Sequence, residues 1–157
     1  MQFDETFSRT PRATGAGCAV FDASGRVLLV QQAKVARGSW HLPMGTVEPF
    51  ENPQEAAVRE ALEEAQLEVE IVLFVNAYLG VYEDGALVLR LVWLARAAPG
   101  QILSFEADEE IMNRGWFTLE EVKDFYVVGK LRMHHTLLAA QDAHVLWQRL
   151  NGSRGSS

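Results

Sequence analysis

The sequence predicts a mixed α/β (α+β) domain in which helices and strands pack in layers. Strand-like and helix-like segments both occur, they do not alternate regularly, and two pairs of strand-like segments are joined by short turn sequences. Irregular mixing argues against a barrel or a doubly wound sheet, which both need regular alternation. The 157 residues are enough for one domain with its own core.

Composition and charge narrow the function classes. The apolar fraction is 48%, the charged fraction is 22%, and the formal net charge is −7, from 14 basic and 21 acidic residues. These apolar and charged fractions exclude general disorder. An acidic protein lacks the basic footprint that nucleic acid or an anionic membrane needs, so we expect neither as a partner. A phosphorylated small molecule stays possible if a cation is recruited locally.

Localisation follows from three absences in the sequence. Cys18 is the single cysteine, so there is no internal disulfide framework and no cysteine-based zinc site. The N-terminal residues are acidic where a signal peptide is basic, and no apolar run approaches the roughly 18 residues of a membrane helix. We expect a cytoplasmic protein. The sequence leaves its oligomeric state open between monomer and homodimer.

The chain divides into one domain with two short flanks. Residues 1–12 are polar and are expected to form a mobile arm. Residues 13–150 form the domain, without a linker-like stretch. Residues 151–157 are rich in glycine and serine and are expected to form a disordered tail.

The first third of the domain reads as strands and loops. Segments 16–21 and 27–32 are strand-like, and the turn residues at 22–25 predict that they form a hairpin. Segment 34–39 is a basic loop, and 40–47 is a short irregular strand with a proline and a glycine.

The strongest helix prediction covers 53–67. Asn52 suits the N-cap, Pro53 suits the first helical position, and Glu55 lies in the first turn. After this helix, strands are predicted at 69–81 and 86–95, and a short strand at 115–117. A second helix is predicted from the Thr118 cap to about 126, with Glu121 in the capping box. A last, amphipathic helix is predicted over 131–150.

The helix at 53–67 separates apolar and acidic residues. At about 100° per residue, one side carries Val58, Ala61, Leu62 and Ala65, and the opposite side carries Glu60, Glu63 and Glu64. Like charges at spacings of three and four residues destabilise a helix. Crowded carboxylates often form a solvated acidic face, but they also suit Mg²⁺, which takes oxygen ligands and shares them with substrate phosphates.

The surroundings of these glutamates decide between the two interpretations. Residues 45–67 fit the skeleton Gly45-x5-Glu51-x7-Arg59-Glu60-x2-Glu63-Glu64. This pattern resembles the Nudix box of the Nudix hydrolase family. The resemblance implies an α/β/α sandwich with a mixed central β-sheet. It also implies metal-dependent hydrolysis of a nucleoside diphosphate linked to another moiety.

The resemblance implies roles for the residues of the box. Glu60, Glu63 and Glu64 would bind Mg²⁺ or Mn²⁺, and the Gly45 carbonyl is a further candidate ligand. Arg59 would be mainly structural and would pair with Glu51, which would orient the site rather than ligate the metal. Glu48, near the box, matches a frequent family acid.

The hydrolytic step also needs a base and cationic partners for phosphate. The resemblance leaves Glu60, Glu64 or an acid outside the box as the base, and an acidic run near 106–110 offers Glu109 or Glu110. Lys34 and Arg37 are candidate phosphate-binding residues.

Six further residues have open interpretations. Arg90 either lies on an exposed strand face, which we favour, or pairs inside the cleft. Tyr78 and Tyr82 either stack on a base or, as is common for strand aromatics, belong to the core. His134 and His135 are adjacent, do not share a helix face, and are expected at the surface with Arg132.

The box departs from the family pattern at two positions, and a third departure precedes it. Gln66 replaces a glycine that would end the helix, which implies strain or a longer helix. Ala61 replaces a bulky aliphatic residue, and Met44 stands where many members have a second glycine. These changes affect local geometry and substrate fit, and they leave the glutamates in place.

The size of the chain bears on the substrate class. The compact chain favours nucleoside triphosphates, including oxidised ones, or dinucleoside polyphosphates over nucleotide sugars and ADP-ribose. A non-catalytic nucleotide sensor is the rival from another class, and a structural acidic module is a second. Both are disfavoured because the box glutamates and Arg59 are all present.

Overall fold

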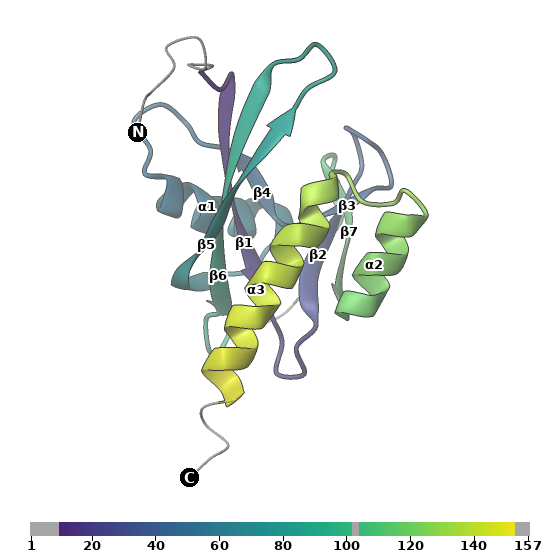
Figure 1. The fold of residues 1–157 in the computed structure, drawn as a ribbon. Coiled ribbons are helices and arrows are strands. Elements are labelled where there is room, and N and C mark those ends of the chain that lie inside the picture. The colour runs from purple at the N-terminus through teal and green to yellow at the C-terminus, as the bar shows by residue number, and fades with distance from the viewer. Residues whose placement is uncertain (1–9, 102–103, 153–157) are drawn as a thin grey trace, which may run out of the picture.

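The computed structural model describes residues 10–101 and 104–152, which form seven strands and three helices (Figure 1). The strands are β1 (Ala13–Val20), β2 (Val27–Gln32), β3 (Trp40–His41), β4 (Met44–Thr46), β5 (Val69–Val81), β6 (Leu87–Ala97) and β7 (Ile111–Phe117). The helices are α1 (Pro53–Ala65), α2 (Leu119–Val127) and α3 (His134–Gly152).

The strands form two sheets between helical layers. The larger sheet is mixed, in the order β4-β1-β6-β5, with β1 parallel to β6 and its other pairs antiparallel. The smaller sheet is antiparallel, in the order β3-β2-β7. Helix α1 lies behind the strands and α3 lies in front of them (Figure 1). The α+β class and the mixed sheet are therefore as predicted, with the strands divided between two sheets.

The predicted hairpin of 16–21 and 27–32 is wrong. In the described part of the chain, β1 and β2 share one bridge, between Phe21 and Val27, and then enter different sheets. The reason is that β1 pairs along its whole length with β6, while β2 pairs with β7. The predicted strand 40–47 likewise divides into β3 and β4, one in each sheet.

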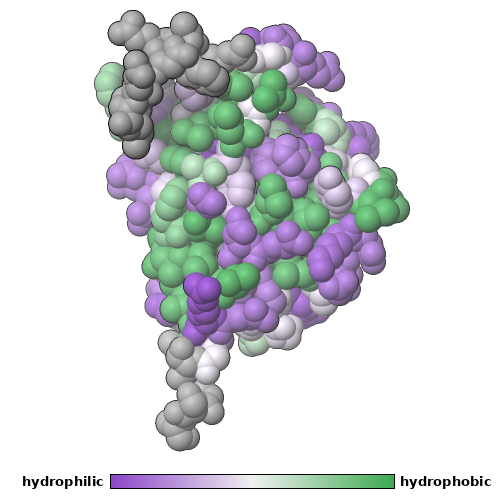
Figure 2. Space-filling view, viewed as in Figure 1, coloured by the Kyte–Doolittle hydropathy of each residue, from purple (hydrophilic) through white to green (hydrophobic). Residues whose placement is uncertain are grey.

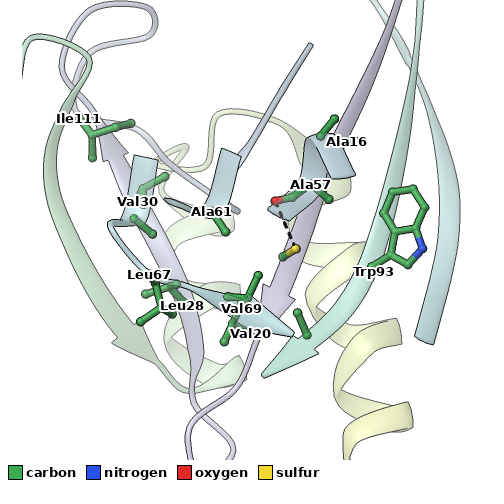
Figure 3. Packing of buried hydrophobic residues seen from close by; sticks show 14 residues of the cluster. Ala16, Val20, Leu28, Val30, Ala57, Ala61, Leu67, Val69, Trp93 and Ile111 are labelled. Atoms are coloured by element: carbon green, nitrogen blue, oxygen red, sulfur yellow. Dashed lines mark hydrogen bonds between the residues drawn. The ribbon is translucent and has the colours of Figure 1, made fainter. Parts of the chain in front are cut away.

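Small residues let α1 pack closely on β1. Ala57 and Ala61 are fully buried, and the Cys18 thiol lies 3.5 Å from the Ala57 carbonyl oxygen (Figure 3). Burial raises the pKa of Cys18 to about 12, so the thiol stays protonated. The alanine at position 61, where the family has a bulky residue, thus brings the helix near the sheet. A second buried cluster fills the α3 side, with Ala139, Ala140 and Ala143 against β6.

The ends of α1 are fixed by side chains. The Asn52 side chain accepts a hydrogen bond from the Gln54 N–H at 2.9 Å, as the N-cap prediction requires. The helix stops at Ala65, and Gln66 adopts the left-handed conformation with φ 53°. Strain, rather than a longer helix, therefore replaces the missing glycine. The Gln66 side chain offsets this strain with two hydrogen bonds to the Glu106 backbone, of 2.7 and 3.0 Å.

The two later helices differ in how well their starts were predicted. Thr118 and Glu121 form the expected capping box at the start of α2. Helix α3 begins at His134 rather than 131, and it continues through Asn151 and Gly152, which the prediction placed in the tail. Residues 1–9 of the predicted arm and 153–157 of the predicted tail lie outside the described residues.

The surface on the α3 side mixes apolar and hydrophilic side chains (Figure 2). Leu138 and Val145 of α3 are each nearly half exposed. Among the described helices, none is both long and apolar enough to cross a membrane.

Two substitutions at Gln66 test the balance between strain and hydrogen bonding. Gln66→Ala removes both hydrogen bonds and keeps the left-handed strain, whereas Gln66→Gly removes the bonds and relieves the strain. We expect Gln66→Ala to be less stable than Gln66→Gly by about 1 kcal/mol, because glycine tolerates positive φ. Urea unfolding of both variants measures the difference. Equal stabilities would show that Gln66 is not strained.

Candidate active site

Helix α1 presents its three central glutamates in different environments. Glu60 is buried, Glu64 is partly buried and Glu63 is exposed. The predicted apolar face is wrong at Leu62, which is half exposed, because the helix rotates Glu60 toward the sheet instead. Gly45 makes this rotation possible, since a Cβ built there would overlap the Glu60 carboxylate.

Arg59 forms hydrogen bonds with three carboxylates of the site. Its Nε and Nη2 donate to the two carboxylate oxygens of Glu51, at 2.8 and 2.9 Å. Its Nη1 donates to Glu60 at 2.9 Å and to Glu63 at 3.0 Å. A forked guanidinium pairs with carboxylates more strongly than a lysine would, because it makes two parallel bonds. Arg59 therefore holds three acids in fixed relative positions.

Glu51 and Glu48 lie on the outer side of this network. Hydrogen bonds from Arg59 and from the Glu48 N–H lower the pKa of Glu51 to about 2. The Glu48 carboxylate is exposed and its nearest atom lies 4.0 Å from Arg59 Nη1. Glu51 is thus a fixed anion that orients Arg59, and Glu48 contributes its backbone more than its side chain.

The inner glutamates are poorly solvated. Burial raises the pKa of Glu64 to about 8, and the nearby Glu60 adds to the shift, although the Met44 N–H donates to Glu64 at 3.0 Å. Burial also raises the pKa of Glu60. The charged carboxylates of Glu60 and Glu64 are poorly solvated and repel each other, which costs free energy. A bound cation reduces this cost. The residues therefore suit a bound cation.

A cleft of about 280 Å³ adjoins these carboxylates. It is lined by Gln32, Lys34, Val35, Met44, Gly45, Glu60, Glu63, Glu64, Glu110 and Arg132. The structure thus brings Lys34 and Glu110 to the predicted metal-binding residues. The backbone of Glu110 is anchored, because its carbonyl accepts a 2.7 Å hydrogen bond from the Ala33 N–H.

Two predicted residues lie elsewhere. Arg37 is not in the cleft lining, and its guanidinium donates to the Ala33 carbonyl of its own loop at 2.7 Å. Glu109 is exposed and is also absent from the lining. Neither residue lies in a strand, because the chain turns at 35–38 and bends at 109–110.

The structure corrects the expectations for Arg90 and His135. Both were expected at the surface, but their exposed fractions are 7% and 3%. Arg132 is also drawn into the cleft, where its Nη1 donates to Gln32 at 3.0 Å. Sequence reasoning missed Gln32 and Arg132 as cleft residues, because their meeting depends on the bridge between Leu131 and Trp40 of β3, the strand next to β2. Tyr78 belongs to the core, and its hydroxyl donates to Asp142 at 2.6 Å.

The oxygen atoms that line the cleft are of the kind that a divalent cation binds. Carboxylates and a backbone carbonyl are the hard oxygen ligands that Mg²⁺ and Mn²⁺ prefer. In the described residues, no three acid, histidine or cysteine side chains already converge on one point. Arg59 explains this, since its Nη1 lies between Glu60 and Glu63 and neutralises both. The residues fit a divalent cation once those two carboxylates turn toward the cleft.

Comparisons with known proteins assign the family. A model of the NUDIX domain matches residues 11–137. The chain belongs to the Nudix hydrolase family. Its Nudix box is the segment from Gly45 to Leu67, which contains Arg59 and the three α1 glutamates of the site.

Related proteins agree with this assignment. The chain is 44% identical over 93 residues to the 8-oxo-dGDP phosphatase NUDT18 of Mus musculus, over 58% of this chain and 28% of that protein. It is 29% identical over 115 residues to an RNA pyrophosphohydrolase of Azorhizobium caulinodans, over 69% of this chain and 60% of that protein. The chain therefore spans less than a third of the length of the mouse relative.

A solved structure supports the fold. A NUDIX hydrolase from Nitrosomonas europaea superposes with a TM-score of 0.73 at 22% identity, over 87% of this chain and 90% of that chain. At this identity the likeness concerns the fold alone.

Two buried histidines make the stability of the domain sensitive to acid. Burial lowers the pKa of His135 to about 4, and it also lowers the pKa of His41. Below pH 6.5 the unfolded chain binds a proton at His135 that the folded chain does not bind until about pH 4, and His41 acts in the same direction. The free energy of unfolding should therefore fall as the pH drops from 6.5 to 4, by at most about 1.4 kcal/mol per pH unit for each histidine.

Urea unfolding at several pH values measures this dependence. His135→Phe should reduce the slope between pH 6.5 and 4, whereas replacing the less buried His144 by Phe should change it less. A slope that His135→Phe leaves unchanged would contradict the assignment.

Proposed function

We propose that the chain is a divalent-metal-dependent pyrophosphohydrolase of small nucleotides. The observation that carries the proposal is the cleft in which Glu60, Glu63 and Glu64 meet Gly45. Nucleoside triphosphates, including oxidised ones, and dinucleoside polyphosphates are the favoured substrates. The name of the mouse relative adds 8-oxo-dGDP to this group.

Mg²⁺ or Mn²⁺ would be held by the carboxylates of Glu60, Glu63 and Glu64, with the Gly45 carbonyl as a further ligand. When bound, such an ion neutralises phosphate charge and lowers the pKa of a bound water. Arg59 keeps its pair with Glu51 while Glu60 and Glu63 turn toward the cleft, so the helix retains a fixed neighbour. Lys34, across the cleft, would contact the phosphate chain.

Glu110 is the acid we assign to proton transfer. It lines the cleft opposite α1, and its backbone is anchored to Ala33. In the proposed step, the oxygen of a water molecule bonds to phosphorus, the bridging P–O bond breaks, and Glu110 takes the proton of the water. A carboxylate held within reach of the attacking water contributes through general base catalysis.

The first test is a panel of substrates with Mg²⁺. It contains unmodified and 8-oxo nucleoside di- and triphosphates, dinucleoside polyphosphates, a nucleotide sugar, ADP-ribose and a 5′-triphosphate RNA oligonucleotide. We expect turnover of one class and a loss of at least about 100-fold in Glu64→Gln, since a ligand matters at least as much as the groups that orient it. Phosphate release, with phosphatase coupling where needed, measures both.

Other outcomes of the panel are equally informative. Turnover of ADP-ribose or the nucleotide sugar alone would replace the favoured class. No turnover of any compound, with a saturable Mg²⁺ site that Glu63→Gln weakens, would favour the non-catalytic sensor. No such metal site would overturn the proposal.

The adjacent acids Glu109 and Glu110 provide a matched pair for the base. Glu110→Gln should lower kcat by about 100-fold or more, the usual contribution of a general base. Glu109→Gln should leave kcat within about 2-fold, since its side chain does not line the cleft. Steady-state kinetics at saturating Mg²⁺ measures both. Equal effects of the two variants would contradict the assignment of Glu110.

A further inference from the structure

A second chamber lies beside the cleft, between the end of β5 and the start of α3. It has a volume of about 360 Å³. Its lining comprises Gly80, Val81, Tyr82, Glu83, Val88 and Arg90 from the β5–β6 hairpin, with Arg132, Met133, His134 and His135. This is within the range of volumes that take a small-molecule ligand.

The chamber is continuous with the cleft. A smaller cavity of about 120 Å³ shares Tyr82, Arg90 and Arg132 with the chamber. The same cavity shares Met44, Gly45 and Arg132 with the cleft. A molecule whose phosphates lie at the α1 glutamates can therefore extend past Gly45 into the chamber.

Arg90 is a buried cation in the wall of this chamber. Its exposed fraction is 7%, and in the described ranges no hydrogen bond or ion pair joins its side chain to a neighbour. The side chain lies over glycines on both flanking strands: a Cβ on Gly80 would come within 2.8 Å of Arg90 Nη1, and one on Gly15 within 3.4 Å of its Cγ. Glycines at these positions leave room for the guanidinium. Its guanidinium nitrogens are not among the fully buried polar atoms that lack a partner, so they open onto the chamber and can bind a ligand.

His135 is a second unsatisfied group beside Arg90. It is 3% exposed, and in the part of the chain that the structure describes neither ring nitrogen has a hydrogen-bond partner. Its ring stacks on Tyr78 at 6.2 Å, and the same Cβ on Gly80 would lie 3.5 Å from its Cε1. A neutral imidazole offers one donor and one acceptor. Arg90 and His135 thus form a polar edge of the chamber that offers hydrogen bonds to a ligand.

The other lining residues complete the character of the chamber. Tyr82 presents an aromatic ring, Val88 and Met133 are apolar, and Glu83 lies exposed at the rim. An apolar slot with a fork of donors at one edge suits a flat heterocycle whose own edge carries acceptors. Among nucleobases, a guanine edge presents O6 and N7 as adjacent acceptors, whereas adenine presents an amino donor beside N7.

We propose that this chamber binds the base of the substrate and that Arg90, with His135, selects 6-oxopurines over adenine. The guanidinium donates to O6 and to a neighbouring acceptor of the base. In an 8-oxopurine, N7 carries a hydrogen and donates a hydrogen bond to the acceptor nitrogen of His135, while O6 stays with Arg90. This inference rests on the proposed function, because it takes the phosphates of the same nucleotide to lie at the α1 glutamates.

The test uses binding of nucleoside monophosphates, so that it does not depend on hydrolysis. Titration calorimetry with dGMP, 8-oxo-dGMP and dAMP is carried out on the full chain. We expect both oxopurines to bind at least about 10-fold more tightly than dAMP, the discrimination usual for a forked arginine contact. In Arg90→Met this preference should fall to about 2-fold or less, with the affinity for dAMP little changed.

Three further variants separate base selection from other effects. Arg96→Met is the matched control, because Arg96 lies on the same strand but is exposed and pairs with Glu70 at 2.8 Å. It should keep the preference. Arg90→Lys keeps the charge without the fork and should retain only part of the preference. Gly80→Ala keeps Arg90 but displaces its guanidinium, and it should reduce the preference even if Arg90→Met fails to fold.

The outcomes that overturn the proposal are distinct from those that overturn the hydrolase. Equal weakening of all three nucleotides by Arg90→Met would make Arg90 a phosphate contact rather than a base contact. No oxopurine preference in the unmodified chain, or no binding of any monophosphate, would also overturn it. Selective binding that Arg90→Met abolishes, without turnover of any substrate, would retain the chamber and exclude the hydrolase.

Discussion

The positive charge of Arg59 is what allows helix α1 to carry its acids. Four of the acids in this region lie within reach of its guanidinium: Glu48, Glu51, Glu60 and Glu63. Without it, α1 would hold like charges at adjacent turns and would bury one of them against the sheet. Glu51 in turn fixes the plane of the guanidinium through two bonds. The position of α1, and hence of the cleft, depends on this charge balance.

The close packing of α1 depends on the opposite property, the absence of side-chain bulk. Ala57 and Ala61 bring the helix near β1, and Gly45 leaves space for the Glu60 carboxylate. A larger residue at any of these positions would push the helix away and separate Glu60 from the Gly45 carbonyl. Small residues on the sheet side and acids on the cleft side therefore act together. The small residues set the distance between α1 and β1, and the acids set the chemistry of the cleft.

Local signals in the sequence predicted the elements well, and they predicted their partners poorly. Asn52, Pro53 and Thr118 marked helix starts correctly, because capping depends on residues a few positions apart. The pairing of β1 with β6 was missed, because that contact joins segments about 75 residues apart and no turn residue encodes it. The turn at 22–25 suggested a hairpin, and the chain uses it to pass from one sheet to the other.

The residues of the site show the same contrast between local signals and long-range contacts. The box positions were found through their resemblance to the family pattern, since Gly45, Glu51, Arg59 and the α1 glutamates lie within one continuous segment. Lys34 and Glu110 line the cleft and Arg37 and Glu109 do not, and the sequence did not separate them because neighbouring loop residues differ only in direction. The burial of Arg90 and His135 depends on α3 crossing the sheet. The position of Arg90, a charged residue in an apolar strand, indicated that it needed an explanation, and we interpreted it as an exposed residue.

The hydrogen bonds from Gln66 to Glu106 limit where this domain can vary. The segment between Glu106 and Glu110 is fastened at one end to the C-terminus of α1 and at the other to Ala33. Inserting or deleting residues there would break one attachment or the other. The tip of the β5–β6 hairpin, residues 82–86, borders the second chamber and is exposed. In the descendants of such a chain, changes of loop length that alter substrate choice should therefore accumulate at this hairpin tip, while the length of the 106–110 segment stays constant.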